Sequence, residues 1–460
     1  MGFDPEMAAI RFGCGLSPQI PAPQSVAEML ARLAGPDRAA QAFAIPGFAA
    51  MEEYNQKLRA ARRALKAAGE AGRKARKKDI QQVRRDAFRA GAGWFGHMLL
   101  RRALAEDGFR ERLCAFWADH FTAAGRQRLM RAAVAPYAEE AIRPHVAGRF
   151  SQMLRAAETH PLMLIYLDQR VSVGPNSKRA QRAGGDLGLN ENLAREMLEL
   201  HTLGVGAPYT QTDVRQLAKL LTGLTYTGRK GVQFRPAWAE PGAETVLGHS
   251  YGGDKARLED IYAFFDDLAN HPATAAHLAR KLAVHFVSDS PDEGMVADMA
   301  ARYRETGGNL PDVYAVMLGH PAAWRPQDGN VKEPMDFIGS ALRALAVAPG
   351  RMPADNLRRM QRLFLGPLEL MGQNWGRPGG PDGLPEEDAD WITPQRLAAR
   401  LQWAVTVPSR LQRVLPDPRA FVDTALGARA GGAVRFAAGA AETRAEGIGL
   451  ILAAHEFQRM

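Results

Sequence analysis

The densest run of ionisable side chains lies in residues 190–204, NENLAREMLELHTLG. Glu191, Arg195 and Glu199 recur at every fourth position, so in a helix they would share one face, and Glu196 lies beside them. Carboxylates next to a guanidinium can supply a general acid, a general base and a clamp for an anionic group. The same spacing is also typical of a solvated helix face, where each Glu–Arg pair contributes only about 0.2–0.5 kcal/mol.

The same segment carries signals for both ends of a helix. The side chain of Asn190 can accept a hydrogen bond from a free amide of the first turn. Gly204 lies where a residue in the left-handed conformation would end the helix. His201 falls on the apolar side with Met197, and so it points away from Glu199. We therefore predict one charged face and one buried histidine, and no metal held by Glu199 and His201 together.

Three further polar residues stand in apolar surroundings, where a polar group is costly unless it is bonded or functional. His120 lies within FWADHFT, Asp168 ends the apolar run 162–167, and His160 precedes Pro161. We predict a site with four catalytic and four substrate-binding residues. The catalytic residues are Glu191, Glu196, His120 and Asp168, and the binding residues are Arg195, Asn190, His201 and His160. Such carboxylates can also hold a hard divalent cation such as Mg²⁺, and the sequence leaves the metal and any other cofactor open.

The elements that must position these residues are predicted to be helices. Apolar residues repeat with helical spacing along most of the 460 residues, which gives an all-α fold with at most a short β-hairpin near 224–235 around GRKG. Helices are expected at 93–105, 109–121, 136–146, 150–158 and 272–286, and a loop at 171–189. Residues 210–213, TQTD, form a capping-box pattern that begins another helix.

The whole chain, 1–460, is predicted to form one helical unit with three regions. Residues 50–90 form a protruding basic helix or helical hairpin with a break near Ala68-Gly69 or Ala71-Gly72. Residues 91–345 form a central core with the candidate site. Residues 346–460 form a C-terminal helical region that contains a Gly/Pro-rich loop at 372–394.

The positive charge of the chain is concentrated in one segment. The formal net charge is +9, and the stretch from Lys57 to Arg89 alone holds 13 Lys and Arg against three acids. This stretch has few aromatic residues to stack on bases, so nucleic acid is disfavoured as a partner. A solvated basic helix explains the pattern, and an acidic protein or a polysaccharide is the alternative partner.

Other features exclude several classes of protein. No stretch reaches the roughly 18 apolar residues of a membrane span. The first residues show no basic stretch followed by an apolar run, so we expect no secretory signal and a cytoplasmic location. The two cysteines, Cys14 and Cys114, form no zinc-like spacing, and Cys114 is expected to be a small core residue.

Several motifs together resemble the bacterial family called domain of unknown function 1800. They occur in this order along nearly the whole chain: 11–15 (RFGCG), 116–122 (FWADHFT), 141–145 (AIRPH), 160–168 (HPLMLIYLD), 190–206, 209–214 (YTQTDV), 221–223 (LTG), 271–274 (HPAT) and 332–334 (KEP). The resemblance implies no established reaction. It does imply that members are often exported and that they commonly accompany a sulfatase-like protein.

The chain departs from this family pattern in three places. It shows no export signal. Where the family usually has His-Asp-Pro-Gly and then a Lys before 246–248, residues 239–244 read AEPGAE, so the His and the Lys are missing. Asp168 is followed by Gln169, where an Asn is commoner. A reaction that depends on the missing pair would be altered or lost here.

Two functions remain open from the sequence. The first is a hydrolase or transferase that acts on a carbohydrate or another polyanionic substrate, with one carboxylate as general base and Arg195 orienting an anionic group. The second is a non-catalytic binding or assembly module, in which the polar helix is a buried ion-pair network and the basic segment docks a partner.

Overall fold

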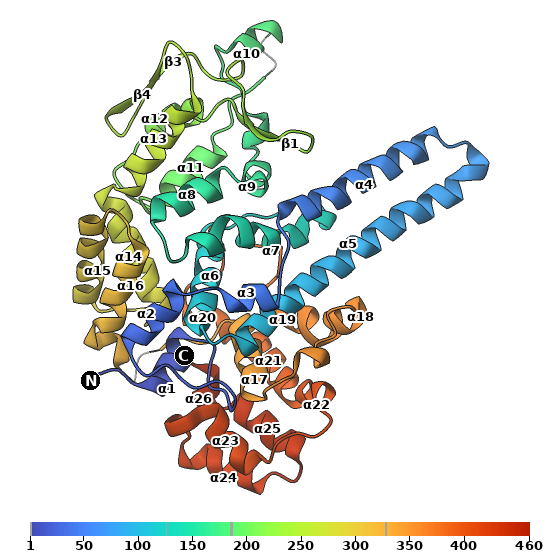
Figure 1. The fold of residues 1–460 in the computed structure, drawn as a ribbon, viewed down its shortest axis with the longest axis vertical. Helices are drawn as coiled ribbons and strands as arrows, with labels where there is room; N and C mark the ends of the chain where they lie inside the picture. Colours follow the sequence, from blue (N-terminus) through green and yellow to red (C-terminus); the bar gives the residue numbers. More distant parts are fainter. Residues whose placement is uncertain (1, 126, 185–186, 327–328) are drawn as a thin grey trace.

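The computed structural model describes residues 2–125, 127–184, 187–326 and 329–460. Within these residues the chain is predominantly helical, as predicted, and two small antiparallel two-stranded sheets accompany the helices (Figure 1). No helix of the described residues is both long enough and apolar enough to cross a membrane.

Helices α4 (Phe48–Ala67) and α5 (Glu70–Leu104) form a two-helix arm that projects from the body of the molecule (Figure 1). The chain reverses at Ala68-Gly69, one of the two breaks indicated by the sequence. The 35 residues of α5 span about 50 Å at 1.5 Å per residue. The basic residues lie on the outer part of the arm, whereas the buried residues of α5 begin at Ala87.

The separate helix expected at 93–105 is wrong, because α5 continues without a break through Gly91 and Gly93. Gly91 is required by packing rather than by a turn: a Cβ atom there would lie 2.5 Å from the Cβ atom of Ala132. Because glycine has no Cβ atom, the 3₁₀ segment η2 (Arg128–Ala133) can approach α5 closely.

Two hydrophobic cores share the inner half of α5. The first core includes α6 (Gly108–His120), α8 (Phe150–Glu158), α14 (Pro272–Phe286) and the helices around them. The second core includes α17 (Pro334–Ala344) and the C-terminal helices. Asp336 links the two cores, because its carboxylate pairs with Arg102 of α5 at 3.1 Å and also with Arg112 of α6. All three side chains are buried.

The first sheet is the hairpin expected near 224–235, formed by β1 (Leu224–Thr227) and β2 (Gly231–Phe234). A second hairpin, β3 (Gly242–Val246) with β4 (His249–Gly253), was not expected from the sequence. Its two turn residues, Leu247 and Gly248, both have positive φ, at 50° and 81°. This is the pattern of a type I′ turn, which Asn or Asp usually begins, so a leucine gives no turn signal.

Three helical segments begin at His-Pro dipeptides, and each histidine caps the segment that follows. The Nδ1 atom of His160 accepts from the amide of Leu162 at 3.0 Å, and His271 does the same for Ala273 at 3.1 Å. His320 caps the third segment in the same way. The following proline has no N–H, so the next amide is the first that needs a partner.

The helix that carries the charged run, α11 (Asn192–Glu199), begins two residues later than Asn190. The Oδ1 atom of Asn190 still accepts from the amide of Asn192 at 2.9 Å, and Gly204 has the expected positive φ, at 95°. The capping box that begins α12 (Gln211–Leu220) is present. The loop expected at 171–189 contains a short helix, α10 (Lys178–Arg182), and its residues 185–186 lie outside the described part of the chain.

The remaining helical elements surround these. In the N-terminal and central parts they are α1 (Pro5–Met7), η1 (Ala8–Phe12), α2 (Val26–Ala34), α3 (Arg38–Ala42), α7 (Val134–Tyr137), η3 (Ala138–Ile142), η4 (Arg143–His145), α9 (Pro161–Tyr166), η5 (Gln169–Val171), α13 (Leu258–Ala269), α15 (Glu293–Thr306), α16 (Leu310–Gly319) and η6 (Pro321–Trp324). In the C-terminal part they are η7 (Pro349–Arg351), α18 (Leu357–Met360), η8 (Gln361–Leu365), α19 (Gly366–Leu370), α20 (Asp388–Trp391), α21 (Pro394–Thr406), α22 (Pro408–Leu411), α23 (Pro418–Leu426), η9 (Gly427–Arg429), α24 (Gly432–Ala440), α25 (Arg444–Ala453) and α26 (His455–Gln458).

Candidate functional site

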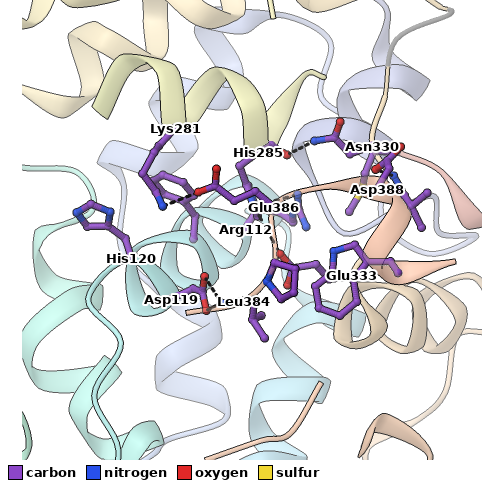
Figure 2. Close-up of a pocket in the computed structure, with 15 residues that line it drawn as sticks. Arg112, Asp119, His120, Lys281, His285, Asn330, Glu333, Leu384, Glu386 and Asp388 are labelled. Carbon is purple, nitrogen blue, oxygen red and sulfur yellow. Dashed lines mark hydrogen bonds and ion pairs between the residues drawn. The ribbon is translucent and has the colours of Figure 1, made fainter. Parts of the chain in front are cut away.

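A polar pocket lies where the two cores meet, and we call it the junction pocket (Figure 2). Its ionisable residues come from α6, from α14, from the residue before α17, and from the start of α20 and the loop before it. They are Arg112, Asp119, His120, Lys281, His285, Glu333, Glu386 and Asp388. Phe116 and Trp391 form the aromatic part of the pocket wall. Four segments far apart in sequence thus bring acids, cations and imidazoles to one place.

Asp119 lies at the C-terminal end of α6, and its side chain faces the loop that covers the pocket. The amide of Leu384 donates to both carboxylate oxygens, at 3.0 and 3.2 Å. Burial raises the pKa of Asp119 to about 7, and the nearby charge of Glu333 adds to this, although the Leu384 amide and Lys281 act in the opposite direction. Near neutral pH this carboxyl can therefore both give and take a proton.

His285 is held in one tautomer by two neighbours. The guanidinium of Arg112 donates to Nε2 at 3.2 Å, which leaves the proton on Nδ1. Nδ1 lies 3.7 Å from a carboxylate oxygen of Glu333. Burial lowers the pKa of His285 well below its usual value, with the charges of Arg112 and Lys281 acting in the same direction. The imidazole is therefore a neutral, oriented hydrogen-bonding group.

The loop before α20 closes the pocket through two contacts. Lys281 of α14 forms an ion pair with Glu386 at 2.5 Å, and Leu384 is bound to Asp119 (Figure 2). The cavity has a volume of about 30 Å³, enough for one or two water molecules. The junction pocket is therefore too small to enclose more than a small group, and any larger ligand would lie mostly outside it.

His120 connects the junction pocket with a second cluster of imidazoles. Its Nε2 atom donates to the backbone oxygen of His201 at 3.0 Å, so Nδ1 carries a lone pair, and this buried atom has no hydrogen-bond partner among the described residues. The ring centroids of His201 and His277 lie 6.1 and 6.3 Å away. Burial lowers the pKa of His120 well below its usual value.

His201 is fully buried, on the apolar face of its segment as predicted. Its Nδ1 atom lies 2.6 Å from a carboxylate oxygen of Glu158, which is also fully buried. Glu196 lies near His201. Burial raises the pKa of Glu196, although His201 acts in the opposite direction. Among the predicted residues, the structure therefore brings together His120, His201 and Glu196.

The other predicted residues lie elsewhere. Glu191 and Arg195 pair with each other at 3.5 Å and with Gln211, and their side chains are about one-third and two-fifths exposed. They form a surface network on α11 and α12. Asn190 accepts from the amide of Asn192, but the N-cap residue of α11 is Glu191, so the predicted cap is displaced by one residue. Of the eight predicted residues, only His120 lines the junction pocket.

Asp168 and His160 have structural surroundings as well. Asp168 precedes η5 with a positive φ of 58°, an unusual conformation that Asp tolerates better than most residues. His160 contacts Glu140 through Nε2 at 3.1 Å while its Nδ1 atom caps α9. Both nitrogens of His160 are therefore occupied.

The sequence contained a signal for the residues that the prediction missed. His277, Lys281 and His285 follow an i, i+4, i+8 pattern on α14, the spacing that drew attention to α11. Glu333 lies in the KEP motif, to which no role was given. Asp119 directly precedes His120 in FWADHFT.

A metal site is not formed by the present arrangement of side chains. Within the part of the chain that the structure describes, no group of three or more His, Cys, Asp or Glu side chains is placed to hold a metal ion. The imidazole and carboxylate contacts described above instead go to protein partners.

The fold and this site define a predominantly helical protein with a pocket of ionisable side chains at the junction of two cores. The chain belongs to the family described as Protein of unknown function (DUF1800), which it matches over residues 8–459. No curated protein and no solved structure matches the chain.

Proposed function

We propose that the junction pocket is the active site of a hydrolase or group transferase that uses Asp119 as its general acid and base. The observation that carries this proposal is the convergence, on one pocket, of Asp119, Lys281, His285 and Glu333 from three separate elements. An ion-pair network that served only stability would pair each carboxylate with a cation. Asp119 instead binds one backbone amide and lies near a second carboxyl group, and it forms no ion pair with the nearby Lys281 among the described residues.

The chemistry follows from the roles available to each group. In its ionised form Asp119 takes a proton from an attacking water, and it returns that proton to the leaving group. Lys281 and Arg112 supply positive charge for an oxygen that becomes negative during the reaction. Glu333 keeps the pKa of Asp119 high and orients His285.

The proposed substrate is a carbohydrate or another polyanionic molecule, because cations and carboxyl groups line the pocket while Phe116 and Trp391 provide ring surfaces. The basic arm is the proposed docking surface for an acidic protein or polysaccharide. A sulfatase-like companion and a cytoplasmic location stay predictions.

The test is a screen of the purified protein against chromogenic glycosides, phosphate esters, sulfate esters and carboxylic esters. We expect turnover of one class, lost in Asp119→Asn. The matched control is Glu387→Gln, which changes an exposed carboxyl on the same loop that does not line the pocket. Equal turnover in Asp119→Asn and the wild type, or no turnover of any class, would count against the proposal.

The alternative, a binding or assembly module, is favoured by one observation. Asp336 and its two arginines are buried and mutually paired, as a purely structural network would be. If the screen finds no reaction and the arm binds an acidic partner, this second function takes precedence.

A further inference from the structure

A groove rich in arginine lies at the base of the two-helix arm, apart from the junction pocket, and we call it the arginine groove. It consists of two hollows of about 630 and 550 Å³, which share Leu357 and Arg358 as lining residues. These volumes are in the range of small-molecule binding sites, roughly 300–1,000 Å³. The groove is bordered by α5, η2, the α18–η8 segment and the loop that follows α19.

Seven arginines line the groove against two acids. The arginines are Arg85, Arg89, Arg128, Arg131, Arg358, Arg362 and Arg377, and the acids are Asp355 and Glu369. Arg377 pairs with Glu369 at 2.5 Å. The other six arginines form no ion pair with any described residue. An anionic ligand in the groove would therefore meet guanidinium groups that no carboxylate of the described residues neutralises.

The arginines approach the groove from different sides. Arg85 and Arg89 lie one helical turn apart on α5, and Arg128 belongs to η2, whereas Arg358 and Arg362 lie on α18 and η8. The guanidinium of Arg128 stacks on the ring of Phe88 at 5.1 Å, which fixes its plane and leaves its N–H edges free. Guanidinium groups bind tetrahedral oxyanions through paired hydrogen bonds, which lysine cannot do.

The floor of the groove is apolar, and it contains one unused donor. Leu357, Leu365, Phe88 and Trp375 contribute to the lining. The Nε1 atom of Trp375 is buried and has no hydrogen-bond partner among the described residues. Such a donor costs about 1–3 kcal/mol when it stays unpaired. Because this atom is shielded from solvent, it becomes available to a ligand oxygen only when the Trp375 ring turns toward the groove.

We propose that the arginine groove binds an organic ligand that carries two or more phosphate or sulfate ester groups on a carbon framework. The separated arginines require more than one anionic group, and the apolar floor requires a framework between them. A single-stranded nucleic acid is a poorer fit, because its bases need exposed aromatic platforms and the ring of Phe88 is covered by Arg128.

The experiment is calorimetric titration of the full chain at 150 mM salt with two anionic probes and, for comparison, a single-stranded oligonucleotide. Inositol hexakisphosphate presents phosphate esters, and a heparin-derived hexasaccharide presents sulfate esters, so the tighter probe identifies the source of the anionic group. The test variant is Arg358→Gln/Arg362→Gln. The control is Lys74→Gln/Lys77→Gln, which removes the same charge from exposed positions on the outer part of α5.

We expect the groove variant to weaken binding of the tighter probe at least tenfold and the control to change it less than twofold. An equal loss in both variants would show that only the overall charge of the arm matters, and it would overturn the proposal. Absence of binding for both probes at millimolar concentration would overturn it too, as would tighter, groove-dependent binding of a single-stranded oligonucleotide.

A second variant, Trp375→Phe, tests the floor of the groove. It keeps an aromatic ring and removes the unpaired N–H donor. We expect a two- to fivefold weaker affinity for the bound probe and an apo melting temperature that is unchanged or higher. An apo protein that melts lower with affinity unchanged would assign Trp375 to packing alone and would contradict its role as a ligand donor.

Discussion

Helices α11 and α14 carry the same pattern of ionisable residues, yet the molecule uses them differently. On α11 and the residue before it, Glu191 and Arg195 face solvent and pair with each other. On α14, Lys281 and His285 face α6 and line the junction pocket, with side chains only about one-fifth exposed. The spacing establishes that side chains share a helix face. Which face becomes a site depends on the elements that pack over it.

The largest expected difference between the two helices is in catalysis. Asp119→Asn alters the carboxyl group near Lys281 of α14. It should lower turnover about 10²–10⁴-fold, the usual contribution of a general acid or base. Glu191→Gln, just before α11, should change turnover less than about twofold, since the Glu191 side chain is part of a surface ion pair with Arg195. The measurement is kcat with the substrate class found in the screen, and a reversed order of effects would remove the distinction.

The next difference lies within the α11 segment itself, between its two faces. Glu158→Ala removes the partner of buried His201 and should lower the free energy of unfolding by about 3–5 kcal/mol. Arg195→Ala should cost no more than about 0.5 kcal/mol, because it breaks one exposed i, i+4 pair. Urea unfolding at pH 7 measures both. A cost below about 1 kcal/mol for Glu158→Ala would mean that the buried pair has little structural role.

The pH dependence of stability reports on Asp119 directly. Its pKa is about 7 in the folded protein against 3.8 as the reference value, so the folded state holds more protons between these values. The contribution is full below about pH 4 and is lost as the pH rises to about 7. The loss is at most about 4 kcal/mol, and solvent at the pocket mouth reduces it. Asp119→Asn should flatten the slope of the free energy of unfolding against pH, measured from pH 4 to 8.

A matched control for this slope is Asp390→Asn, an exposed carboxyl in α20 near the pocket. It should leave the slope as in the wild type. If both variants show the wild-type slope, Asp119 is not the group that titrates.

The smallest expected effect concerns one cation on each helix, Lys281 on α14 and Arg195 on α11. Lys281 lowers the pKa of Asp119, so Lys281→Met should raise that pKa further and move the pH profile of kcat upward, by about 0.5–1 unit. Arg195→Met, which removes the cation from the exposed face of α11, should leave the pH profile of kcat unchanged. A shift caused by Arg195→Met and not by Lys281→Met would contradict the assignment of the pocket.

Much of the fold could be predicted because its signals are local. Helix α8 has the expected bounds, α14 begins at its His-Pro dipeptide, and the first hairpin and the capping box are present. The expectations that failed depended on contacts between distant segments. The helix expected at 93–105 is part of the longer α5, in which Gly91 allows the close approach of Ala132, and the second hairpin uses a leucine with positive φ.

The site was less predictable for the same reason. His120 and His201 stood out because each is polar in an apolar run, and the structure brings their rings together. Glu333 and the Leu384 loop reach Asp119 from more than 200 residues away along the chain, and no local pattern indicates such a meeting. Glu191 and Arg195 of the charged run on α11 were more conspicuous in sequence, and their side chains pair with each other at the surface.

The histidine caps make the starts of two helices sensitive to acid. Burial lowers the pKa of His160 and of His271, so the folded state keeps both imidazoles neutral with Nδ1 free to accept. As the pH falls below about 6.5, the unfolded chain binds protons that the folded state refuses, so stability begins to fall. Once the pH reaches the lowered pKa of each folded histidine, protonation converts the acceptor into a donor and the amide of Leu162 or Ala273 loses its partner. A cap of this kind contributes about 1 kcal/mol. Mild acidification therefore loosens α9 and α14 together, and α14 is the helix that carries Lys281 and His285 to the junction pocket.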